Sequence, residues 1–197
     1  MRIWLILFLF LYLEGCSIKN KKDISVNPSG PDLWFQSARQ GDFEKLKHLK
    51  VDLHHDWTHA SSHGVTALMI AARYGHIELI QNLLQEQPQQ IQLLDRYSYS
   101  ALSYALYGVS SEDQKKQMCS IFIEQGVDPF QEDHLKLSPL LVLIEWGYFE
   151  CIKKITFTKK SPCDQQKRLS DMVSLIEYAN REGAIEIASF LKQQGCK

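Results

Sequence analysis

The chain of 197 residues carries 22 Lys and Arg against 23 Asp and Glu, which gives a formal net charge of −1. Charged residues make up 23% and hydrophobic residues 45%, and both are ordinary proportions for a globular protein. This balance excludes a wholly disordered chain, a collagen-like chain and a strongly basic nucleic-acid binder. The length suits one domain with an added segment and not a large multidomain enzyme.

The N-terminus differs from this average. An uncharged apolar run, Ile3–Leu13, follows Met1 and Arg2. It is too short to span a bilayer, but it has the length of the apolar core of a secretory signal peptide. The next residues, Leu13-Glu14-Gly15-Cys16, resemble the lipobox of bacterial lipoproteins, although Glu14 stands where a small or apolar residue is usual. The resemblance implies cleavage before Cys16 and lipidation of Cys16. An ordinary cleaved signal and an uncleaved anchor are the alternatives.

The segment after the lipobox-like motif is polar. It contains three lysines and ends in Pro28-Ser29-Gly30, which predicts a flexible tether over residues 16–31 that follows a signal peptide over residues 1–15. Ser17 is not the Asp that retains enterobacterial lipoproteins at the inner membrane. The resemblance therefore favours a bacterial cell envelope location, lipid-anchored at the outer membrane and facing the periplasm.

A repeated unit begins after the tether. Its clearest copy spans residues 64–84 (GVTALMIAARYGHIELIQNLL). Ala71-Ala72 suits close packing of a first helix, Gly75 suits a left-handed turn, and the following apolar stripe suits a second helix. This copy resembles an ankyrin repeat, with Ala67 where Pro is usual and Met69 where His is usual.

The unit recurs at Ser100-Ala101-Leu102 and at Ser138-Pro139-Leu140. The step from Leu68 to Leu102 is close to the ankyrin period, whereas the step from Leu102 to Leu140 is longer. The longer step predicts an insertion over residues 107–113, between the two helices of that copy. Weaker copies begin near Trp34 and Ile176. The predicted fold is therefore all-α, an ankyrin-repeat solenoid of about five helix-turn-helix units over residues 32–197.

The resemblance implies a concave binding face made by the inter-repeat hairpins and one side of each first helix. Mapping by motif onto this chain places Ser62, Val65 and Leu137 there, and it predicts these partner-binding residues: His63, Arg73, Tyr74, Arg96, Tyr97, Tyr99, Tyr107, His134, Leu135, Glu145 and Trp146. Tyr, Trp and Arg are enriched among interface hot spots, which favours binding of a protein partner. The alternative is that the aromatic side chains pack on one another and tile the surface.

Four histidines occur in the link between the first and second units, residues 54–63. On a helix, His55, His59 and His63 would share a face suited to Zn, Cu or Ni. The repeat register places them in a link, however, and favours solvated histidines with no bound metal and no cofactor.

The five cysteines divide by position. Cys119 and Cys151 lie on apolar faces of second helices, which predicts buried thiols. Cys163 and Cys196 lie after the fourth unit and near the C-terminus, where an oxidising compartment permits a disulfide between them.

The sequence lacks the G-x-S-x-G, glycine-rich phosphate-loop and H-E-x-x-H motifs, which argues against an enzyme. The favoured hypothesis is a monomeric, lipid-anchored, non-enzymatic protein that binds a protein partner in the periplasm and binds no nucleic acid. An immunity-type protein that masks a toxin or an enzyme is one concrete version. The alternatives are a metal-handling or enzyme-accessory lipoprotein that uses the histidine-rich link, and a structural scaffold of the envelope.

Overall fold

The computed structural model describes residues 30–109, 111–155 and 174–196. The predicted signal peptide, Cys16 and nearly all of the predicted tether lie outside this range, as does Cys163. The first described helix begins at Gly30, two residues before the predicted start of the repeat domain. Across the described ranges, no helix is long and apolar enough to cross a membrane.

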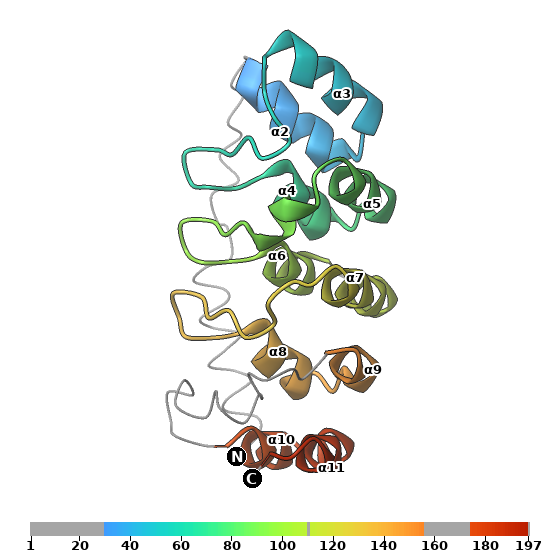
Figure 1. Cartoon of the computed structure of the whole chain (residues 1–197), viewed down its shortest axis with the longest axis vertical. Helices are drawn as coiled ribbons and strands as arrows, with labels where there is room; N and C mark the ends of the chain where they lie inside the picture. The colour runs from blue at the N-terminus through green and yellow to red at the C-terminus, as the bar shows by residue number, and fades with distance from the viewer. Residues whose placement is uncertain (1–29, 110, 156–173, 197) are drawn as a thin grey trace.

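The described residues form five pairs of antiparallel helices that stack in one direction (Figure 1). The first helices of the pairs are α2 (Gly30–Gln40), α4 (Ala67–Tyr74), α6 (Ala101–Gly108), α8 (Pro139–Glu145) and α10 (Leu175–Arg181). The second helices are α3 (Phe43–Asp52), α5 (Ile77–Glu86), α7 (Glu112–Glu124), α9 (Phe149–Lys153) and α11 (Ile185–Gln193), and a 3-10 helix, η1 (Pro88–Gln92), follows α5. Among these residues there is no β-strand, only an isolated bridge between Ala60 and Thr66. The prediction of an all-α solenoid is confirmed.

Each first helix after the first pair begins at a hydroxyl side chain. The oxygen of this residue accepts a hydrogen bond from the backbone N–H three residues later, which satisfies a donor that the helix itself leaves unpaired. The pairs are Thr66 with Met69, Ser100 with Ser103, Ser138 with Leu141, and Ser174 with Glu177. The repeated Thr or Ser therefore sets the start of the helix in each repeat.

The turn between the helices of a pair depends on glycine. Gly75 ends α4 with φ of 77°, in the left-handed region, and its N–H donates to the carbonyls of Ala71 and Ala72. An L side chain is strained in this conformation, whereas glycine adopts it freely. The chain can then reverse direction within two residues and begin α5 at Ile77.

The core runs along the interface between the pairs. Leu68, Ala71 and Ala72 of α4 are fully buried, and so are Ile80 and Leu83 of α5. The small alanine side chains let α4 and α6 approach closely. Because each pair buries its apolar surface against its neighbours, the core is continuous along the solenoid.

The insertion in the third unit lengthens its second helix. α7 has 13 residues, whereas α5 has 10. The prediction placed residues 107–113 between the two helices, but α6 continues to Gly108 and α7 already begins at Glu112. The start of α7 packs on the fourth unit, because Tyr148 donates a hydrogen bond to Glu112 and the Lys115 ammonium lies 4.4 Å from the centre of the Trp146 ring.

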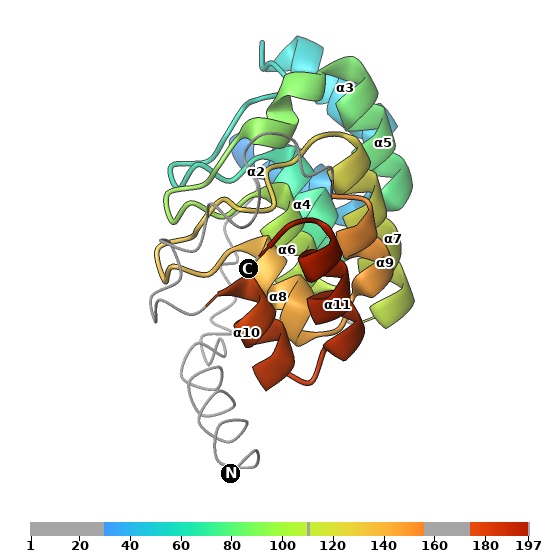
Figure 2. The same cartoon turned by 60° about the horizontal axis from the view of Figure 1, so that its bottom comes forward.

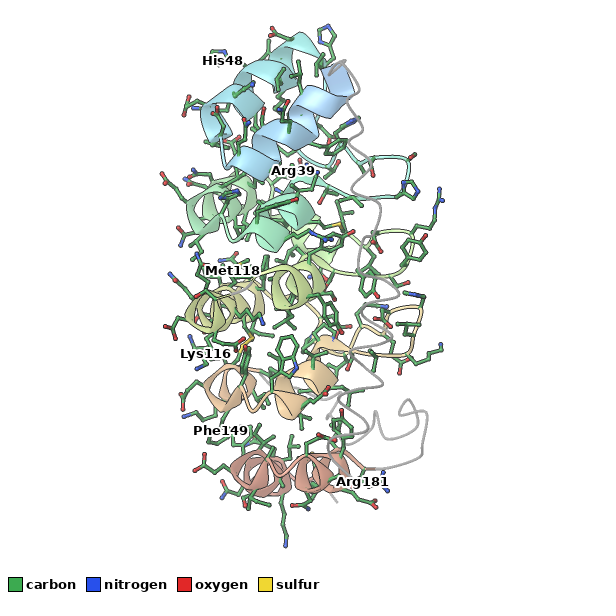
Figure 3. The ribbon with its side chains drawn as sticks, turned by 180° about the vertical axis from the view of Figure 1, so that it is seen from behind. Arg39, His48, Lys116, Met118, Phe149 and Arg181 are labelled. Carbon is green, nitrogen blue, oxygen red and sulfur yellow. A yellow bond between two sulfur atoms is a disulfide. The ribbon has the colours of Figure 1, made fainter. Side chains whose placement is uncertain are left out.

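Cys119 and Cys151 are buried, as expected, but the prediction of thiols was wrong. The two residues form a disulfide that joins α7 to α9, between the second helices of adjacent units (yellow in Figure 3, near Lys116). Their Cα atoms are 6.1 Å apart, within the range that a disulfide requires. Cys196 is also disulfide-bonded. Its predicted bond to Cys163 stays a prediction, since Cys163 is outside the described ranges.

Candidate protein-binding surface

Three loops project from one side of the stack, opposite the second helices (Figures 1 and 2). We call these loops fingers, and their tips comprise residues 61–65, 95–99 and 133–137. We call the side of the solenoid that the fingers and first helices share the inner face. This is the face that the family resemblance describes as concave.

An acidic side chain closes the turn of the second finger. The Asp95 Oδ1 atom accepts hydrogen bonds from the N–H groups of Tyr97 (2.8 Å) and Tyr99 (2.9 Å). The Asp95 N–H donates to the Tyr99 carbonyl, and Ser98 takes a positive φ of 63° at the tip. Asp133 closes the third finger in the same way, with Leu135 and Leu137 as donors, and the Ser61 hydroxyl does so in the first finger with His63 and Val65. Each finger is therefore a rigid turn held by a local side chain.

Backbone hydrogen bonds also join neighbouring fingers. The Arg96 N–H donates to the His63 carbonyl at 2.8 Å, and the His134 N–H donates to the Tyr97 carbonyl at 3.0 Å. The Arg96 guanidinium adds a bond of 2.8 Å to the Ser62 carbonyl. The fingers therefore form one row with a fixed spacing, and a ligand would meet a preformed surface.

Aromatic side chains line the inner face beside this row. We call Tyr97, Tyr99, Tyr107, Trp146 and His134 the aromatic band. The centre of the Tyr107 ring lies 6.1 Å from that of Tyr99 and 6.4 Å from that of Trp146, both in edge-to-face contact, and Tyr99 also meets His134 at 5.5 Å. Such contacts between rings stabilise the surface. The aromatic side chains therefore pack on one another, which is one of the two alternatives that the sequence allowed.

The band nevertheless stays exposed. Tyr107 is 50% exposed, Tyr97 46% and Trp146 37%, and the adjacent fingertip residue Leu135 is 59% exposed. Large apolar side chains held rigidly at a surface are what interface anchors require, because little side-chain entropy remains to be lost on binding. Tiling and binding are thus compatible uses of the same rings.

A partly buried hydrogen bond lies beneath the band. The Tyr104 hydroxyl donates to Asp95 Oδ2 at 2.9 Å, and burial together with this bond raises the pKa of Tyr104 far above its usual value. The hydroxyl therefore remains a donor at any physiological pH. Asp95 joins α6 to the finger, because its other oxygen holds the finger turn.

The ends of the first helices carry charged side chains of both signs. Arg39 of α2 lies over the Tyr74 ring at 5.4 Å, and Arg73 of α4 is packed against Gly108 of α6. In the fourth unit, Glu145 of α8 has a raised pKa, because partial burial and the Glu182 carboxylate both disfavour its charge. The equivalent residue of the fifth unit is Arg181.

Residues 34–113 match the family model for ankyrin repeats, described as three copies. The fold is an ankyrin-repeat solenoid. The search of curated proteins found no match. Ankyrin repeats mediate protein–protein interactions, so the matched repeats imply a protein partner for this chain.

The ankyrin register distributes the predicted binding residues over two parts of the inner face. The fingers carry His63, Arg96, Tyr97, Tyr99, His134 and Leu135, and the ends of the first helices carry Arg73, Tyr74, Tyr107, Glu145 and Trp146. Tyr74 stands apart from the aromatic band, since it contacts His76 and Arg39. Sequence reasoning missed Arg39 and Glu182, although Arg39 stands one repeat before Arg73 and the repeat spacing could have revealed it.

The histidine-rich link packs against the first ankyrin unit. The rings of His55 and His59 are stacked with their centres 3.5 Å apart, and both contact the buried Trp34. His63 belongs to the first finger instead. Burial and the nearby His55 lower the pKa of His59. This link is therefore an aromatic cap on the first repeat.

This arrangement does not favour a metal site. The lone pairs of a histidine lie in its ring plane, so two parallel stacked rings direct them side by side and not toward one ion. Among the residues that the structure describes, no group of three or more His, Cys, Asp or Glu side chains is placed to hold a metal ion.

Proposed function

We propose that this ankyrin-repeat protein is a lipid-anchored envelope protein that binds a protein partner through its inner face in the periplasm. The exposed aromatic band carries the binding part of the proposal. Rigid Tyr and Trp side chains beside a fixed row of fingers offer anchors that need no refolding on contact. A partner surface with apolar pockets would gain most of its affinity from these few residues.

Two observations support the location. The segment Leu13-Glu14-Gly15-Cys16 resembles a lipobox, and acyl chains on one cysteine give stable membrane anchoring. The disulfide between Cys119 and Cys151 is typical of an oxidising compartment, because cytosolic thiols are kept reduced. An immunity-type role, in which the inner face masks a toxin or an enzyme that reaches the periplasm, is the concrete form we favour.

The binding proposal is tested with exposed residues only. The double variant Tyr97→Ala with Tyr107→Ala removes two anchors from the inner face. The matched control, Val51→Ala with Ile185→Ala, removes two apolar side chains that are 71% and 61% exposed on the second helices. Quantitative mass spectrometry after cross-linked capture from envelope extracts should show proteins that the first variant loses and the control retains. Equal capture by both variants would show that the inner face is not the binding surface.

The anchoring proposal has a separate test. Cys16→Ala removes the sulfur that lipidation requires, whereas Ser17→Ala is a control that leaves it in place. Labelling of the Cys16 protein by a palmitate analogue, and its loss in Cys16→Ala together with release from the membrane fraction, is the expected result. Retention of Cys16→Ala in the membrane fraction would point to an uncleaved anchor and contradict the lipoprotein assignment.

A further inference from the structure

Contacts between aromatic rings hold the link between the first and second units, residues 53–60, against α2. The rings of His55 and His59 are parallel to within 8°, and their centres are 3.5 Å apart. The Trp34 ring meets both of them edge to face, at 5.5 Å and 6.2 Å, and Phe35 stacks on His59 at 5.7 Å. Two titratable rings therefore lie within the contact between the link and α2.

This arrangement is unfavourable for protonated histidines. Both nitrogens of an imidazolium carry a hydrogen, and a buried N–H needs an acceptor. His55 Nε2 is buried, and the described residues offer it no hydrogen-bond partner. A second proton on His59 would also place two like charges on rings that are 3.5 Å apart. The stacked form therefore holds at most one of the two protons that separate histidines would bind.

Asp56 is the carboxylate that favours a charge on His59. Its Oδ1 atom accepts hydrogen bonds from the Thr58 hydroxyl and from the Thr58 N–H, the latter at 2.6 Å. Burial and the nearby His55 nevertheless lower the pKa of His59, since together they outweigh the attraction of Asp56. The neutral form of the stack is therefore the stable one at neutral pH.

The charged side chains that contact the link from α3 and α5 are placed on Trp57. The Lys50 ammonium of α3 lies 5.3 Å from the centre of the Trp57 ring, and Glu86 of α5 accepts a hydrogen bond of 3.1 Å from Trp57 Nε1. The residues of α2 that contact the histidines, Trp34 and Phe35, carry no charge. These contacts therefore do not compensate a charge on the stack.

The link leads directly into the first finger. Ala60 forms the isolated bridge with Thr66, which caps α4. In this finger, the His63 ring contacts the Ser62 hydroxyl, and the His63 carbonyl accepts the Arg96 N–H of the second finger. Movement of the link therefore affects the N-terminal end of the row of fingers.

We propose that His55 and His59 form a pH-sensitive switch, in which proton uptake releases the link from α2 and loosens the first finger. The closed link is the form at neutral pH. The open link is favoured as the pH falls, because it binds more protons than the closed link. The switch belongs to the fold of the first unit and does not depend on which partner the inner face binds.

The expected magnitude follows from the number of protons. A histidine in the open link has a pKa of about 6.5. If opening adds one proton, the equilibrium constant for opening should rise about eightfold between pH 6 and pH 5. Asp56 stays ionised over this range, because the hydrogen bond from the Thr58 hydroxyl lowers its pKa.

Hydrogen exchange of the full chain, followed by NMR and corrected for the intrinsic exchange rate, measures this opening. The Ser61 N–H, which donates to the Val65 carbonyl at 2.9 Å, should lose protection about eightfold between pH 6 and pH 5. The Asp95 and Asp133 N–H groups make the equivalent bonds in the second and third fingers and serve as internal controls. Their protection should not change.

Variants assign the effect to the stack. His55→Phe with His59→Phe keeps two flat rings that cannot be protonated, so the protection of Ser61 should no longer depend on pH. His55→Gln with His59→Gln, which has smaller side chains, should show lower protection that is equally independent of pH. His48→Phe is the matched control, because His48 is an exposed histidine of α3 in the same unit (labelled in Figure 3), and it should retain the eightfold loss.

Three results would overturn the proposal. Constant protection of Ser61 between pH 6 and pH 5 would show that the link does not open. An equal loss at Asp95 and Asp133 would show that acid loosens the whole solenoid. An unchanged loss in both double variants would show that groups other than His55 and His59 cause the opening.

Discussion

The disulfide between Cys119 and Cys151 predicts a specific pattern of stability among cysteine variants. It joins two second helices whose cysteines are 32 residues apart in sequence. Cys119→Ala and Cys151→Ala each break the same cross-link, and the double variant breaks it once. The losses in free energy of unfolding should therefore be far from additive.

The magnitude follows from the size of the closed loop. Cross-linking residues at this separation lowers the conformational entropy of the unfolded chain, which amounts to about 3.7 kcal/mol at 25 °C. Both sulfurs are buried, and loss of each adds about 1 kcal/mol of packing. Each single variant should lose about 5 kcal/mol of stability and the double variant about 6 kcal/mol. If the two cysteines were independent thiols, each single variant would lose about 1 kcal/mol and the double variant about 2 kcal/mol.

Urea unfolding followed by circular dichroism without reductant measures these values. Cys196 is left unchanged in every variant, so its own disulfide is common to all. Reductant should lower the stability of the unmodified chain much more than that of the double variant. Losses that simply add between the two single variants, or a double variant as stable as the unmodified chain, would refute the cross-link.

Three further predictions concern stability. Gly108→Ala should destabilise the fold by about 1–3 kcal/mol in urea unfolding, because the added Cβ would lie 2.6 Å from the Arg73 carbonyl oxygen. In the control Gly126→Ala, the added Cβ has no atom within 4 Å, and only the positive φ of 84° costs stability, about 1 kcal/mol. Equal losses in the two variants would contradict the steric argument. The free energy of unfolding should fall as the pH drops below about 6.5, because His59 has a lowered pKa in the folded state and is therefore protonated first in the unfolded chain. His59→Gln should reduce this dependence of stability on pH. An unchanged dependence would show that another group causes it. Glu145→Gln should raise stability at pH 7 by up to about 0.5 kcal/mol, since the raised pKa of Glu145 means that its ionised form is disfavoured in the folded state. The gain should vanish below about pH 4, where the carboxyl is protonated in both states, and no gain at pH 7 would contradict the assignment.

The local features of the ankyrin fold were readable from the chain. Ser100 and its equivalents cap helices through their own hydroxyl groups, and Gly75 provides a left-handed turn whatever its surroundings. The spacing of Leu68, Leu102 and Leu140 located the units because each unit repeats the same local chemistry. The insertion was placed less well, since the sequence could not show that its residues continue α7 as an added helical turn.

The candidate site was predictable in composition and not in arrangement. The repeat register identified Tyr97, Tyr107 and Trp146 as residues of the inner face, and all three are there with exposed rings. The register could not show that Tyr107 is in edge-to-face contact with both Tyr99 and Trp146. Contacts between rings depend on side-chain orientation, and this orientation depends on how the side chains of neighbouring repeats pack together.

Length, near-neutral total charge and repeat spacing were sufficient to predict a helical solenoid, because each ankyrin unit is built by interactions within about 35 residues. Other properties required groups from different units to meet. Cys119 reaches Cys151, and the His134 N–H reaches the Tyr97 carbonyl, only when the units are stacked. The disulfide and the rigid row of fingers are therefore properties of the stack, since no single repeat contains both members of either pair.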